Sequence, residues 1–195
     1  MESEKGRLEK FQKGGTMIYI SQIYTTAPKK GKNPTEDKTF ALLEKLHIPY
    51  ERVENDIVET MEECKEIDKA LGTEIRKSIF LCNQKKTSFF LVVLPADKQL
   101  DTGALGKKIG VSKLSFAPEN KMEEYLGCKP GYASVMGLLN DEDEYVQLIV
   151  DKEVAKEEWF GCNSGTNQTH LKIKTQDLLN NFLPRIYHKA KIVEL

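Results

Sequence analysis

The sequence lacks the motifs that mark most metal-dependent and nucleotide-dependent proteins. Its cysteines, Cys64, Cys82, Cys128 and Cys162, include no C-x-x-C pair, and its three histidines are scattered. This is not a zinc-ligand spacing. No G-x-G-x-x-G, Walker or G-x-S-x-G sequence is present, so dinucleotide sites, nucleoside triphosphate sites and serine-hydrolase elbows are not indicated. We therefore expect no metal and no organic cofactor.

Long apolar runs and a strong charge of one sign are also missing. No apolar run approaches the ~20 residues that span a bilayer, and the N-terminus is polar, without a signal-peptide core. These features predict a cytoplasmic protein with reduced thiols and no membrane partner. The net charge is −1, so contacts with RNA would have to come from local basic clusters.

The composition is that of an ordinary folded domain. The chain has 195 residues, of which 39% are hydrophobic and 30% charged, enough for one core without disulfides or metals. Residues 1–16 are rich in Lys and Glu and end in Gly-Gly-Thr. We predict a flexible N-terminal lead-in over residues 1–16 and a single compact domain over residues 17–195.

Capping residues and apolar spacing predict the main helices. Asn33 precedes Pro34 and is followed by Glu36, and Thr60 is followed by Glu63, so each sequence is typical of a helix start. Gly72 is expected to end the second helix. Further helices are predicted over residues 101–110, 118–126 and 176–187.

Apolar, strand-forming runs predict the sheet. Single strands are expected over residues 49–53 and 169–173, and hairpins over residues 78–81 with 88–94 and residues 136–139 with 145–150. Because helices alternate with strands while two strand pairs are hairpins, a purely parallel sheet is disfavoured. We predict the α/β class with a mixed sheet and packed helices.

Six segments, in one order along the chain, carry a resemblance to a known family: residues 46–50, 60–64, 77–83, 114–117, 129–140 and 161–163. Together they resemble the YbaK/ProX family of aminoacyl-tRNA editing domains, and most closely its ProX/PrdX branch, a domain associated with prolyl-tRNA synthetase. The resemblance implies a single-domain fold with a curved, barrel-like mixed sheet and surrounding helices. It also implies hydrolysis of an amino acid wrongly attached to tRNA.

Lys77 matches the lysine that this family uses in its editing pocket. An aminoacyl-tRNA is an activated ester, so its hydrolysis requires positioning and charge stabilisation more than a strong nucleophile. One lysine that holds the terminal phosphate or the developing charge is sufficient, with help from the ribose hydroxyl of the RNA. The alternative is a strand-edge lysine that protects against aggregation.

The loop Gly131, Tyr132, Ala133 and Ser134 matches the family's glycine-led substrate loop. Glycine permits a positive φ and close approach of backbone to a ligand, and backbone N–H groups there can bind a substrate carbonyl. A pocket walled by backbone would admit alanine and exclude proline. The alternative is an ordinary Pro-Gly turn before a strand.

Asn163 is the main departure from the family. Many relatives have Gly-Cys-His-Pro where this chain has Gly-Cys-Asn-Ser, and many have a histidine near Asn55. Asparagine can orient a substrate but cannot titrate near neutral pH. Asn163 is therefore either a substrate-binding residue or a polar turn residue. No general base is evident, and Cys162 is best explained as a packed thiol.

These residues predict an aminoacyl-tRNA deacylase that acts in trans on Ala-tRNA(Pro). Its expected partners are the acceptor end of a mischarged tRNA and a prolyl-tRNA synthetase. Lysines at 29–32, 85–86 and 107–108 would contact phosphates only if they lie on the face that bears Lys77. Two alternatives remain: a catalytically silent module that binds tRNA or an amino acid, and a deacylase of another charge such as Cys-tRNA(Pro).

Overall fold

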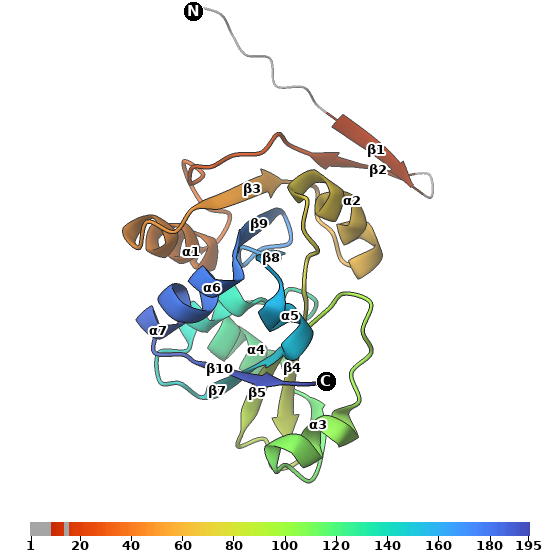
Figure 1. The fold of residues 1–195 in the computed structure, drawn as a ribbon, viewed down its shortest axis with the longest axis vertical. Coiled ribbons are helices and arrows are strands. Elements are labelled where there is room, and N and C mark those ends of the chain that lie inside the picture. The colour runs from red at the N-terminus through yellow and green to blue at the C-terminus, as the bar shows by residue number, and fades with distance from the viewer. Residues whose placement is uncertain (1–8, 14–15) are drawn as a thin grey trace, which may run out of the picture.

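The computed structural model describes residues 9–13 and 16–195. Most of the predicted lead-in, residues 1–8 and 14–15, lies outside this range, so its flexibility and the boundary at residue 17 remain predictions. The part that is described forms β1 (Glu9–Lys13), which pairs antiparallel with β2 (Thr16–Ile20). This two-stranded ribbon extends from one end of the molecule (Figure 1).

The larger sheet is mixed, as predicted. Its strand order is β10-β7-β5-β4-β6, and β5 pairs antiparallel with β4 but parallel with β7. Its strands are β4 (Lys77–Asn83), β5 (Phe89–Leu94), β6 (Leu114–Phe116), β7 (Val146–Asp151) and β10 (Ala190–Val193).

A smaller antiparallel sheet lies beside it, with the order β3-β9-β8. Its strands are β3 (Tyr50–Glu54), β8 (Trp159–Asn163) and β9 (Thr169–Lys174). An isolated parallel bridge between Ile75 and Gly161 is the point where the two sheets meet. The described strands therefore form separate open sheets, and the barrel-like closure that the resemblance implied is not confirmed.

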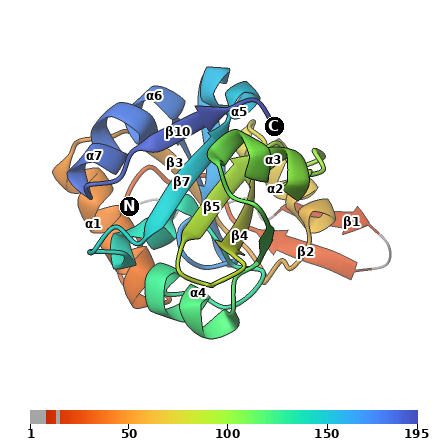
Figure 2. The same ribbon diagram turned by 90° about the horizontal axis from the view of Figure 1, so that it is seen from below.

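The core lies on both faces of the larger sheet. Every residue of β5 is buried. Phe89, Leu91 and Val93 face the main core, which the smaller sheet also covers, and Phe90 and Val92 face a second core beneath α3 (Thr102–Ile109). Figure 2 shows α3 over one face of this sheet. Burial on both faces explains why β5 is a continuous apolar run rather than an alternating one.

The predicted helix starts are confirmed. In α1 (Pro34–Lys45), the Asn33 side chain accepts a hydrogen bond from the Glu36 N–H. In α2 (Met61–Leu71), Thr60 and Glu63 form the expected capping box, and Gly72 ends the helix in the left-handed conformation. The predicted helix over residues 118–126 is α4 (Glu119–Leu126). A short helix, α5 (Lys152–Lys156), follows β7.

The predicted second hairpin is wrong. Residues 135–140 form a 3₁₀ helix, η1 (Val135–Asn140), which Ser134 caps through its hydroxyl, and β7 pairs with β5 and β10 instead. The run from Val135 to Leu138 is buried on all sides. A short, fully buried apolar run looks the same in sequence whether it forms a strand or a helical turn.

The last predicted helix is present but divided. It consists of α6 (Thr175–Asp177), a π-helical turn η2 (Leu178–Phe182) and α7 (Leu183–Arg185). Pro184 lacks a backbone N–H and cannot continue a regular helical ladder, so the wider turn before it is a local adjustment of the kind seen at prolines and π-bulges.

Candidate functional site

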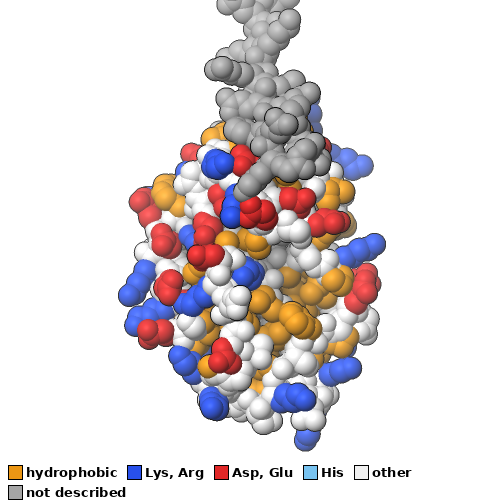
Figure 3. Space-filling view, turned by 90° about the vertical axis from the view of Figure 1, so that its right-hand side faces the viewer, with side chains coloured by type: hydrophobic (Ala, Val, Ile, Leu, Met, Phe, Trp, Pro, Cys, Tyr) orange, Lys and Arg blue, Asp and Glu red, His pale blue; other side chains and the backbone are white. Residues whose placement is uncertain are grey.

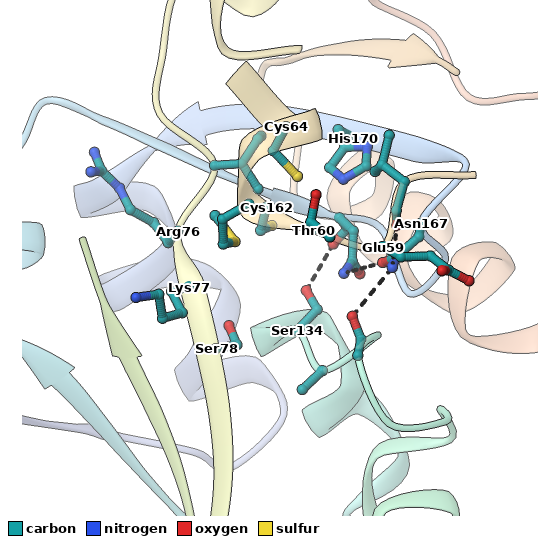
Figure 4. Close-up of a pocket in the computed structure, with 16 residues that line it drawn as sticks. Glu59, Thr60, Cys64, Arg76, Lys77, Ser78, Ser134, Cys162, Asn167 and His170 are labelled. Carbon is teal, nitrogen blue, oxygen red and sulfur yellow. Dashed lines mark hydrogen bonds between the residues drawn. The ribbon is translucent and has the colours of Figure 1, made fainter. Parts of the chain in front are cut away.

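A cavity of about 200 Å³ lies where the two sheets meet (Figure 4). The start of α2, the start of β4, the loop before η1 and the turn between β8 and β9 form its walls. The residues that line it are Val58, Glu59, Thr60, Met61, Cys64, Ile75, Arg76, Lys77, Ser78, Gly131, Ala133, Ser134, Cys162, Asn163, Asn167 and His170.

The structure brings most of the predicted site residues together. Lys77, Gly131, Ala133, Ser134 and Asn163 all line this cavity, although they come from three separate parts of the chain. Tyr132 is the exception. It lines a neighbouring groove together with Asn33, Lys129 and Gly165. Its backbone carbonyl accepts a hydrogen bond from Asn163 Nδ2, a residue of the cavity, at 3.4 Å.

Lys77 lines the cavity, but its side chain is directed away from the cavity interior. Along β4, Phe80 and Cys82 face the main core and Leu81 faces the opposite core, so strand alternation directs Ser78 toward the cavity and Lys77 away from it. The Lys77 ammonium donates to the Lys98 carbonyl at 2.7 Å. In Figure 4 it is directed away from Ser134.

The Lys77 charge is uncompensated, unlike that of its neighbour. Lys98 pairs with Asp151 at 2.9 Å and Glu153 at 2.7 Å, whereas no ion pair of Lys77 is found in the described part of the chain. An ammonium has three donor hydrogens. With one held by the Lys98 carbonyl, two remain for an anion.

Asn163 holds the wall of the cavity together. Its Nδ2 donates to Asn167 Oδ1 at 3.1 Å and to the Tyr132 carbonyl, and its Oδ1 accepts from the Gly165 N–H at 3.0 Å. Asn167 in turn donates to the carbonyls of Val58, at 2.7 Å, and Gly131, at 3.2 Å. Both amide hydrogens of Asn163 are therefore engaged, so it shapes the pocket rather than presenting a free donor.

The glycine-led loop is fixed by its backbone geometry. Gly131 has φ +86°, and a Cβ placed there would meet no atom within 4 Å. Its conformation, rather than crowding, requires glycine. Ser134 donates from Oγ to the Asn163 carbonyl at 2.8 Å and caps η1, so its hydroxyl is also structural.

Sequence reasoning missed several polar residues of the cavity, Ser78 and His170 among them. Strand alternation in β4 was the signal for Ser78, because it places that hydroxyl on the cavity face. His170 had no local signal. It lies on β9 directly opposite Asn163 of β8 and Val53 of β3, and this register is a tertiary property.

Burial determines the protonation of the cavity's titratable groups. It lowers the pKa of His170 to about 3, so its imidazole is neutral near pH 7. It raises the pKa of the Cys64 and Cys162 thiols to about 12. A thiol that stays protonated is a poor nucleophile. All four cysteines are free and buried, which agrees with the prediction that Cys162 is a packed thiol.

The start of α2 lines the cavity, and the carboxylate of Glu63 in its first turn is hydrogen bonded to backbone amides there. Glu63 Oε2 accepts from the N–H groups of Glu59, at 2.8 Å, and Thr60, at 3.0 Å. These two hydrogen bonds lower the pKa of Glu63 below its usual range. Glu63 therefore satisfies the two backbone amides that directly precede the helix.

Not all of the predicted basic clusters lie beside Lys77. Lys85 and Lys86 lie in the β4–β5 turn, at the opposite end of β4, and Lys108 donates to the Glu194 carbonyl. Figure 3 shows Lys and Arg interspersed with Asp and Glu around a central group of hydrophobic side chains.

The described residues form neither a metal cluster nor a membrane-spanning helix. Across residues 9–13 and 16–195, no three His, Cys, Asp or Glu side chains are grouped so that they would hold a metal ion. Over the same residues, none of the helices has both the length and the apolar character needed to cross a membrane.

Comparison with known proteins shows the family of this chain. The profile of the aminoacyl-tRNA editing domain matches residues 56–180. The prolyl-tRNA editing protein ProX of Acetoanaerobium sticklandii is 35% identical over 139 residues, 71% of this chain and 85% of that protein. Prolyl-tRNA synthetase associated domain-containing protein 1 of Danio rerio is 29% identical over 153 residues, 77% of this chain and 82% of that protein.

A solved structure supports the fold. The crystal structure of a candidate trans-editing enzyme for prolyl-tRNA synthetase superimposes with a TM-score of 0.62 at 19% identity, over 85% of this chain and 98% of that one. The mixed α/β fold is therefore shared. The chain belongs to the aminoacyl-tRNA editing family, and the enzyme class predicted from its sequence, an aminoacyl-tRNA deacylase, is the class of this family.

Proposed function

We propose that this chain hydrolyses mischarged proline tRNA in trans, with Ala-tRNA(Pro) as its preferred substrate. The observation that carries the proposal is the meeting of Lys77, the Gly131 loop and the Asn163 turn on one cavity. The ProX relative is named a prolyl-tRNA editing protein, which supports proline tRNA as the substrate.

The size of the cavity favours a small aminoacyl group. Its volume of about 200 Å³ is below the ~300–1,000 Å³ of sites that enclose drug-sized ligands. A whole nucleotide would not be enclosed, so the terminal adenosine stays at the mouth and only the amino acid enters. The backbone wall at Gly131, held by the Asn163 and Asn167 amides, then excludes side chains larger than the cavity.

Lys77 would anchor the RNA end at the mouth. Its ammonium is free of carboxylates and is directed away from the polar wall of the cavity. That placement suits a terminal phosphate outside the cavity better than an ester inside it. The phosphate would take the two hydrogens that the Lys98 carbonyl leaves free.

The loop would hold the ester carbonyl. Ala133 lines the cavity, and no described group accepts a hydrogen bond from its backbone N–H. A fixed backbone donor at this point stabilises the charge that develops on the carbonyl oxygen during attack. Water then adds to the carbonyl carbon, the ester C–O bond breaks, and the leaving ribose oxygen takes a proton with help from its neighbouring hydroxyl.

The alternatives predict different outcomes of one experiment. Purified chain is incubated with Ala-tRNA(Pro), Cys-tRNA(Pro), Ser-tRNA and correctly charged Pro-tRNA(Pro), and amino acid release is followed against a no-enzyme control. We expect alanine release to be fastest and proline to be spared. Faster release of cysteine would overturn the specificity, and tight binding without release from any tRNA would indicate the silent module.

The same proposal includes a prolyl-tRNA synthetase as a partner of this chain. An editing protein that acts in trans competes with other proteins for the mischarged tRNA, so proximity to the synthetase that releases it raises its effective concentration. We include this synthetase as a partner. Addition of the synthetase to the release assay is expected to increase the rate at low concentrations of this chain.

A further inference from the structure

We propose that His170 positions the attacking water for the hydrolysis. The inference deepens the proposed function and rests on it. It starts from the register of the smaller sheet, in which His170 of β9 is the direct cross-strand partner of Asn163 of β8. Paired residues share a face of the sheet, and both line the cavity.

The hydrogen bonds around Asn55 determine the tautomer of His170. Asn55 Nδ2 donates to the Asp56 carbonyl at 2.7 Å and to the Asn167 carbonyl at 2.9 Å. The reversed amide would place its oxygen against these two carbonyl oxygens. Asn55 Oδ1 is therefore the atom that lies 2.9 Å from His170 Nδ1. Because an amide oxygen only accepts, Nδ1 carries the hydrogen.

The other ring nitrogen is consequently an acceptor. In a neutral imidazole with a hydrogen on Nδ1, Nε2 has the lone pair. Within the described residues, the hydrogen bond given for the His170 ring is the one between Nδ1 and Asn55. In the view of Figure 4, the His170 ring lies across the cavity from Lys77 and Ser78. Its Nε2 is thus an acceptor that can bind a water molecule in the cavity.

The surroundings keep the ring neutral. Burial is the cause of the lowered pKa of His170, and no carboxylate opposes it. The charged side chains that line the cavity are Glu59, Arg76 and Lys77. A ring that does not take a proton accepts a hydrogen bond from water and orients its oxygen. It does not carry the proton away, which is consistent with transfer of that proton to the ribose oxygen.

The central strand makes this position rigid. β9 is hydrogen bonded on both sides, to β3 and to β8, and the His170 side chain is 1% exposed. A catalytic group on such an element is held with less freedom than one on a loop.

The test compares His170→Ala and His170→Gln with the matched variant His188→Gln. His188 is also buried but lies outside the cavity, near Asp141. For Ala-tRNA(Pro), we expect kcat of both His170 variants to fall by about 10²-fold with little change in KM, the size expected for misplaced reactants. Added imidazole should restore part of the activity of His170→Ala, and His188→Gln should keep its kcat.

A second readout does not depend on activity. The ¹⁵N chemical shifts of the His170 ring should report the neutral form with hydrogen on Nδ1. The opposite tautomer would overturn the inference, as would folded His170 variants with unchanged kcat. Inactive wild-type protein on every tRNA tested would instead overturn the proposed function, and the inference with it. Thermal unfolding of each variant identifies any that has lost its fold.

Discussion

The β4 wall of the cavity carries a charged side chain beside solvent, whereas the β8–β9 wall consists of buried neutral groups. Lys77 is half-buried and its charge is unpaired. Asn163, Asn167 and His170 are 8%, 5% and 1% exposed. Asn163 donates a hydrogen bond to Asn167, and the His170 ring is hydrogen bonded to Asn55. A charged group that water still reaches has a small desolvation cost, whereas every group of a buried polar network needs a hydrogen-bond partner. The β4 wall is therefore suited to binding a charged ligand, and the β8–β9 wall to fixing the shape of the cavity.

Removal of one member of the buried network should have the largest effect on stability. Asn167→Ala leaves the carbonyls of Val58 and Gly131 without their donor, and each unpaired buried group costs ~1–3 kcal/mol. We expect the free energy of unfolding to fall by about 3 kcal/mol in urea denaturation. Lys77→Ala should change it by less than about 0.5 kcal/mol, as is usual for surface positions. Equal losses would remove the distinction between the walls.

The pH dependence of stability should come from the β8–β9 wall. Burial lowers the pKa of His170 from 6.5 to about 3, so between these values the unfolded chain binds a proton that the folded chain does not. Stability is therefore lost as pH falls below 6.5. One such group gives about 1.5–2 kcal/mol between pH ~6.5 and ~5. His170→Gln should lack this component when unfolding is measured at both pH values, and an unchanged slope would contradict the assignment.

Alanine variants of two glycines distinguish the effect of backbone strain on stability from an effect on substrate binding. Gly131 and Gly72 have φ +86° and +62°, and a Cβ at either would meet no atom within 4 Å. Each change to alanine should cost ~1–2 kcal/mol of stability through its left-handed conformation. Only Gly131→Ala places a methyl group at the cavity, so only this variant should raise KM for Ala-tRNA(Pro). A similar KM for both variants would show that the loop does not contact the substrate.

The smallest effect is expected at Cys162. Burial raises the pKa of its thiol to about 12, so it is protonated and does not act as a nucleophile. Cys162→Ala should lower the unfolding free energy by about 1 kcal/mol through lost packing and leave kcat within about twofold. A loss of kcat as large as that of a nucleophile variant would contradict this account.

Local signals were sufficient for the elements that end at caps and turns. Asn33, Thr60 and Gly72 marked helix ends because capping depends on a few neighbouring residues. The β4–β5 hairpin followed from its turn. The parallel pairing of β7 had no such signal, because the partners are far apart in the sequence and Val135–Leu138 is buried on every side.

The candidate site residues could be predicted from the sequence only where they match residues of the family. Lys77 and the Gly131 loop were identified by matching residues, and the structure places them on one cavity. The direction of the Lys77 side chain follows from strand alternation within β4, and the role of Asn163 follows from contacts with Asn167 and Tyr132. His170 could not be found from sequence because its partner Asn55 is 115 residues away.

The most direct test of the central claim is kcat/KM for Ala-tRNA(Pro) in wild type, Lys77→Ala and the matched control Lys85→Ala, measured at two salt concentrations. Lys85 lies in the turn at the far end of the same hairpin. If Lys77 anchors a phosphate at the cavity mouth, its variant should lose at least ~10-fold, mainly through KM, and its salt slope should fall by about one, while Lys85→Ala behaves as wild type. Equal kinetics in all three proteins would contradict the account.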